Sequence, residues 1–140
     1  MRNTTLINAL YQNTDMGLNA IRKIYPKIQN SSLRNEVKNQ FLCYKQQKHK
    51  YVDLMKAGKI SVEKVPLMIK AMTSTGIAFN CAKDDSSEHI AEMLIQGTNM
   101  GIIEGRRLMN HKHADKEVER LVSDYVKNQE KAVEELKNFL

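Results

Sequence analysis

Three side chains are the candidates in this sequence for binding a transition metal: His49, Glu92 and Glu104. Imidazole nitrogen and carboxylate oxygen are suitable ligands for iron and manganese, so these residues are the candidates for a metal site. Glu104 falls on the apolar helical face of a run that begins at Ile90, and we expect its carboxylate to be partly buried. A buried carboxylate is paired, protonated or a ligand, and a Lys or Arg from the N-terminal hairpin would be the partner for pairing.

The histidines and the methionines each have an explanation that needs no metal. His49 and Asp53, four residues apart, are typical of an exposed helix pair, and His89 falls in the first turn of its expected helix. His111 and His113 lie in a turn, where histidines serve more often as caps than as ligands. Methionines at helical spacing are typical core residues, and no Cys or His accompanies them in a motif: Met68, Met72, Met93, Met100 and Met109.

The sequence lacks the patterns of established catalytic machinery. It has no Ser-His-Asp order, no Gly-rich nucleophile elbow and no phosphate-binding loop. Cys43 and Cys81 lack metal-type spacing and fit the reduced thiols of a cytoplasmic protein. No secretory signal is recognisable, and the most apolar stretch, Ile90–Ile103, is too short and too polar to span a bilayer. These patterns predict a cytoplasmic protein without a membrane span and favour a role other than catalysis.

The net charge of +6 is unevenly distributed along the chain. Residues 1–60 hold eleven Lys and Arg against three acids, whereas residues 61–140 hold eleven against thirteen. Such a basic half can bind nucleic acid or an acidic partner, but the pattern favours a solvated helix face. Lys45, Lys48, Lys50 and Lys56 are expected to go most of the way round a helix, leaving no stripe for a phosphate backbone. We therefore expect no specific binding of nucleic acid.

Helical periodicity accounts for the chain, and no strand is predicted. Five helical segments are expected, over about Thr5–Tyr25, Leu33–Lys56, Val62–Ala82, Asp84–Met109 and Ala114–Leu140. Four are long and their connections are short, which predicts an all-α, up-and-down four-helix bundle with an additional helix, in one domain over residues 1–140. The third segment is shorter and is either a crossover element or a full member of the bundle. Ser31 or Ser32 is expected to cap the second segment and Gly58 to end it, while Asp85 and Glu88 form a capping box on the fourth.

Three glycines recur every four residues inside the fourth segment: Gly97, Gly101 and Gly105. A glycine inside a helix costs about 1 kcal/mol relative to alanine, so a compensating contact is expected. Because residues four apart share a helical face, the missing side chains would let another backbone approach closely. The pattern places this segment at the centre of the bundle.

The helix lengths and order resemble those of the ferritin-like superfamily over most of the chain. The run Ser87–Ile103 is also similar to an uncharacterised bacterial family of ferritin-like bundles, through Ser-Glu-His-Ile-Ala-Glu-Met-Leu-Ile-Gln-Gly-Thr-Asn-Met-Gly-Ile-Ile. The superfamily's metal motif is one Glu on each of two helices and Glu-x-x-His on each of the other two. Carboxylates bridge the two cations there and imidazole completes each coordination sphere.

This sequence departs from that ligand pattern on each helix. The second segment has Gln46 in place of the Glu before His49, and the fourth has His89 and Glu92 in reverse order. An amide oxygen is a neutral donor and does not balance the charge of two ferrous ions. We expect the amides to satisfy one another by hydrogen bonds, in a bundle that lacks an intact di-iron motif. Such amides stand at interior positions of the first, second and fifth segments: Asn13, Gln47 and Gln129.

The sequence thus predicts a ferritin-like helical bundle without a di-iron centre or other cofactor, acting as a structural or protein-interaction protein. The alternative is an iron- or manganese-binding protein or oxidoreductase with an atypical ligand set around His49, Glu92 and Glu104. A third interpretation is a helical adaptor whose basic N-terminal hairpin meets an acidic partner. The apolar face on each helix also favours a homodimer, although the charge on residues 1–60 opposes it.

Overall fold

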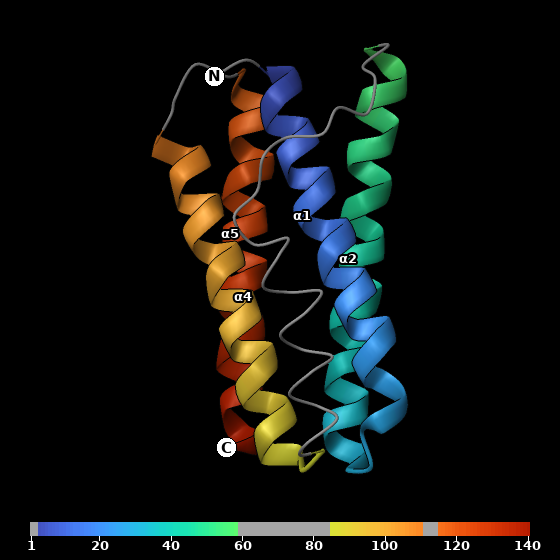
Figure 1. Cartoon of the computed structure of the whole chain (residues 1–140). Helices are drawn as coiled ribbons and strands as arrows, with labels where there is room; N and C mark the ends of the chain where they lie inside the picture. Colours follow the sequence, from blue (N-terminus) through green and yellow to red (C-terminus); the bar gives the residue numbers. More distant parts are fainter. Residues whose placement is uncertain (1–2, 59–84, 111–114) are drawn as a thin grey trace.

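The computed structural model describes residues 3–58, 85–110 and 115–140, and these residues form four long helices and no strands. The helices are α1 (Asn3–Ile24), α2 (Ser31–Ala57), α4 (Ser87–Asn110) and α5 (Lys116–Leu136), with short 3₁₀ turns at Tyr25–Lys27 and Lys137–Phe139. They pack side by side as a bundle (Figure 1). The prediction of an all-α bundle is confirmed, while the segment expected over Val62–Ala82 lies outside the described residues.

Two buried clusters, one toward each end of the bundle, establish the directions of the helices. One cluster joins the end of α1, the starts of α2 and α4, and the end of α5: Ile24, Leu33, Ile90 and Leu136. The other joins the start of α1, the ends of α2 and α4, and the start of α5: Leu6, Met55, Leu108 and Val118. Hence α1 is antiparallel to α2, and α4 is antiparallel to α5, whereas α2 and α4 run in the same direction (Figure 1).

The antiparallel order predicted for helices joined by short connections is observed for α1 with α2 and for α4 with α5. α2 ends at one end of the bundle and α4 begins at the other (Figure 1), so the chain between them joins opposite ends. No described helix has the length and apolar character needed to cross a membrane.

At the starts of α2 and α4, the residue whose side chain caps the helix differs from the one that the sequence predicts. Asn30 caps α2, since its Oδ1 accepts from the Leu33 backbone N–H at 2.9 Å, so the expected Ser31 or Ser32 cap is wrong. Ser86 caps α4 in place of Asp85, accepting from the His89 N–H at 3.2 Å. Gly58 ends α2 as predicted, and its N–H donates to the Leu54 carbonyl at 3.0 Å. In each case a short polar side chain or a glycine satisfies groups that the helix leaves unpaired.

The glycine face of α4 packs against α5, and large side chains fill the space that the glycines leave. A Cβ built on Gly101 would lie 2.9 Å from Tyr125 Oη and 3.1 Å from Gln129 Oε1. A Cβ built on Gly105 would lie 2.6 Å from Val126 Cγ2 and 3.1 Å from the Tyr125 ring. The close approach predicted at these two glycines is confirmed, but the nearest atoms belong to side chains and not to a backbone. The glycines thus make room for an aromatic ring and an amide in the core.

Gly105→Ala is expected to destabilise the protein by about 1–3 kcal/mol, because the methyl group overlaps Val126 and outweighs the gain in helix propensity. Gly101→Ala should cost less, since its nearest contact would be 2.9 Å rather than 2.6 Å and its second neighbour, Gln129, has a longer and more flexible side chain than Val126. Urea denaturation of each variant measures the change. Asn99→Ala, at an exposed position of α4, is the control and should be neutral or slightly stabilising. A Gly105→Ala variant as stable as the wild type would contradict the packing described here.

Candidate functional site

A layer of polar side chains crosses the interior of the bundle. Seven polar residues of the described helices are buried: Asn8, Asn13, Thr14, Gln40, Gln47, Thr98 and Gln129. The burial predicted for Asn13, Gln47 and Gln129 is confirmed, with 6, 7 and 5% of each residue exposed. A cavity of about 50 Å³ lies at the middle of this layer, lined from all four helices by residues that include Asn13, Gly17, Tyr44, Thr98, Gly101 and Gln129.

The expectation that these amides satisfy one another is wrong. Asn13 has no hydrogen-bond partner for either Nδ2 or Oδ1, and Gln47 has none for Oε1. Gln47 Nε2 reaches only the Cys43 sulfur, at 3.8 Å, and Gln129 Oε1 accepts a long bond of 3.4 Å from the Tyr44 hydroxyl. Because the three amides project from three different helices, their mutual distances depend on helix packing, which periodicity does not give.

Three buried tyrosines belong to this layer: Tyr44, Tyr51 and Tyr125. Sequence reasoning placed them in the apolar repeat and missed their hydroxyl groups as part of a polar interior. Burial raises the pKa of Tyr44 to about 12, an effect that its hydrogen bond to Gln129 partly offsets. Burial also raises the pKa of Tyr51 and that of Tyr125. All three phenols are therefore neutral at physiological pH, and the layer supplies no negative charge from them.

The structure places the three metal candidates at different sites. His49 is exposed on α2. Glu92 is exposed near the start of α4, 3.9 Å from His89 Nδ1. Glu104 is partly buried as predicted, with 14% of its side chain exposed, but its partner is Arg107 on the same helix, at 2.8 Å, and not a residue of the N-terminal hairpin. Within the described ranges, no group of three or more His, Cys, Asp or Glu side chains is arranged to hold a metal ion.

Two further groups of residues named from the sequence have different outcomes. Cys43 is a half-buried free thiol, and burial raises its pKa, which lowers the fraction of reactive thiolate. His111, His113 and Cys81 lie outside the described residues.

A basic groove of about 300 Å³ runs between α1 and α2 on the outer surface. It is lined by Leu18, Arg22, Lys45, Lys48, His49, Val52, Asp53 and Lys56. The interpretation that the four lysines of α2 go most of the way round the helix is wrong for Lys45, Lys48 and Lys56, which line the same groove. Spacings of three and eight residues place all three on one face of the helix. Lys50 alone lies elsewhere, in a second hollow beside α5.

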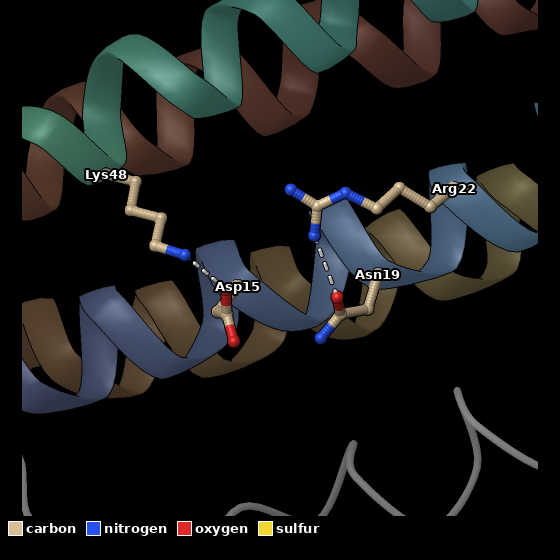
Figure 2. Close-up of polar contacts among 4 residues, drawn as sticks. All are labelled: Asp15, Asn19, Arg22 and Lys48. Atoms are coloured by element: carbon tan, nitrogen blue, oxygen red, sulfur yellow. Dashed lines mark hydrogen bonds and ion pairs between the residues drawn. The ribbon is translucent and has the colours of Figure 1, made fainter.

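Specific contacts hold the basic side chains of this groove in place. Lys48 of α2 reaches Asp15 of α1, with 2.7 Å between Nζ and Oδ1, and Arg22 donates to Asn19 Oδ1 at 3.0 Å (Figure 2). The Arg22 guanidinium also lies 5.4 Å from the centre of the Phe41 ring. Anchored cations of this kind lose less conformational entropy on binding an anion than free ones.

Comparison of the chain with family models, with curated proteins and with solved structures finds no significant match. The neutral interior and the basic groove are therefore the two candidate functional sites of the described helices.

The raised tyrosine pKa predicts a loss of stability in alkali. The unfolded chain releases the Tyr44 proton near its ordinary pKa of 10 and the folded chain only near 12, so the unfolded state binds fewer protons in between. The contribution of the neutral Tyr44 phenol to the free energy of unfolding is therefore fully present below pH 10 and is lost as the pH rises to about 12. Tyr44→Phe removes this contribution, so its stability should fall less steeply than that of the wild type over the same range. Urea midpoints measured at neutral pH and from pH 10 to 12 test this, and equal slopes would contradict it.

Proposed function

We propose that this protein is a ferritin-like helical bundle without a di-iron centre that acts by binding an acidic segment of a partner protein in its basic groove. The observation that carries the proposal is the groove itself, where Arg22, Lys45, Lys48 and Lys56 stand beside a single lining carboxylate, that of Asp53. Positive potential in a concave site attracts acidic ligands and speeds their association.

The lining of the groove favours an acidic peptide over a nucleic acid. Leu18 and Val52 give it apolar surface, which suits the aliphatic side chains of a peptide. A phosphate backbone has no apolar group to place against Leu18 and Val52, and its evenly spaced charges could not avoid the carboxylates of Asp15 and Asp53 as a peptide with alternating acidic and aliphatic side chains can. We therefore propose no specific nucleic-acid partner and place the protein in the cytoplasm as an interaction protein rather than an enzyme.

The directions of the helices support the ferritin-like part of the proposal. Ferritin-like folds are four-helix bundles with one long crossover connection, and here the chain between α2 and α4 joins opposite ends of the bundle. The neutral interior supports the absence of a di-iron centre, because the amides and phenols at the middle of the bundle do not offset the charge of two metal ions.

The peptide proposal is tested by reversing charges inside and outside the groove. A labelled peptide that alternates glutamate with leucine is the probe, and its affinity is measured by fluorescence anisotropy at increasing salt. The double variant Lys45→Glu/Lys56→Glu should weaken binding by about tenfold or more, which corresponds to about 1.4 kcal/mol. The control Lys38→Glu/Lys50→Glu makes the same change of net charge at exposed positions of α2 outside the groove and should have little effect.

Equal losses in the two double variants would show that net charge alone attracts the peptide and would overturn the proposal. A salt-resistant, sequence-selective complex with DNA would overturn it as well, because it would show that the surface reads nucleic acid. The iron or manganese alternative is tested on protein purified without chelator. Near-stoichiometric metal that is lost in Glu92→Ala or Glu104→Ala would replace our proposal with that alternative.

We also propose that the protein forms a homodimer, as most homo-oligomers are two-fold dimers. The basic α1–α2 surface would repel its symmetry mate, so the dimer is expected to use a surface that does not place two such grooves face to face. Light scattering at micromolar concentration in moderate salt should give twice the chain mass of 16.1 kDa. A mass of one chain would contradict the dimer and leave the peptide proposal intact.

A further inference from the structure

We propose that the central cavity is a binding site for a small, uncharged molecule that carries a carboxamide or urea group. The cavity lies between all four helices, and Asn13, Tyr44, Thr98 and Gln129 line it together with Gly17 and Gly101. This site is separate from the basic groove, because none of the residues that line the groove lines the cavity.

The strongest indication of a ligand is the side chain of Asn13. It is 94% buried, it lines the cavity, and both its amide nitrogen and its amide oxygen lack a hydrogen-bond partner. A buried polar group without a partner loses its hydrogen bonds to water and gains none in return, so native proteins rarely leave such a group unpaired. An asparagine needs an acceptor and a donor side by side, and another amide offers that pair, since its N–H₂ and C=O form two parallel bonds with the first.

The charge of the lining argues for a neutral ligand. No charged side chain lines the cavity among the described residues. Tyr44 does not provide a charge either, because burial raises its pKa to about 12. An ion in this cavity would lose part of its hydration without gaining a counter-charge, whereas a neutral amide would exchange hydrogen bonds to water for hydrogen bonds to the protein.

The volume of the cavity limits the size of the ligand. The space of about 50 Å³ is less than two water molecules occupy in the liquid, at about 30 Å³ each, so it limits the ligand to a molecule as small as formamide, acetamide or urea. The glycines keep this space open: a Cβ built on Gly17 would lie 3.2 Å from the Tyr44 ring, and one built on Gly101 would lie 3.1 Å from Gln129 Oε1. Side chains at these two positions would crowd the polar groups that face the ligand.

The test compares acetamide with acetate, which has the same shape and carries a negative charge. Each is titrated into ¹⁵N-labelled protein, and the side-chain amide signals of Asn13 and Gln129 and the backbone signals of Gly17 and Gly101 are followed. Acetamide should shift these signals saturably, with a dissociation constant on the order of millimolar, and acetate should not. Asn13→Leu replaces the amide by an apolar group of similar size and should abolish the shifts of the remaining lining residues. Asn99→Leu, at an exposed position of α4, is the matched control and should retain them.

Several results would overturn the proposal. They are the absence of a saturable shift with acetamide, an equal response to acetate, and an unchanged response in Asn13→Leu. The first of these would show that the cavity holds water only. The comparison of acetamide with acetate uses the wild-type protein, so it decides the proposal even where Asn13→Leu fails to fold. Peptide binding in the basic groove does not enter any of these measurements.

Discussion

The contact between the glycine face of α4 and the large side chains of α5 is the constraint on which the interior depends. Tyr125 occupies the space beside Gly101 and Gly105, and Gln129 lies over Gly101. An aromatic ring and an amide thereby enter the core between α4 and α5. Since a phenol and an amide each need a partner when buried, this contact brings hydrogen-bonding groups into the middle of the bundle.

A polar interior of this kind is stable only if it stays neutral. The layer is built from amides, hydroxyls and phenols, and burial raises the pKa of its tyrosines, which keeps the phenols protonated. Glu104 is a largely buried carboxylate, but 14% of its side chain is exposed and it pairs with Arg107. In the described helices the buried polar side chains thus carry hydrogen-bonding capacity but no charge, which is chemistry for recognising a neutral group.

The sequence predicted those features that depend on local periodicity. Helix extents, the buried positions of Asn13 and Gln129, and the tight site at Gly101 follow from spacing along one helix. Features that depend on two helices were missed or wrong: the unpaired Asn13 amide and the groove beside Arg22. The caps failed for a local reason, because several short polar residues adjoin each helix start and spacing does not choose among them.

The two sites are linked through α1, which turns opposite sides toward them. Asn13 and Gly17 line the neutral cavity. On the other side of the helix, Arg22 lines the basic groove and Asp15 pairs with Lys48 of the groove (Figure 2). Because only one helix separates the two, the positive charge of the groove adds to the cost of placing a cation in the cavity. A bundle with a metal centre needs carboxylates inside to offset such a field. The described helices instead have amides around the cavity and cations along the groove. The amides favour a neutral ligand in the core, and the cations favour an acidic ligand at the surface.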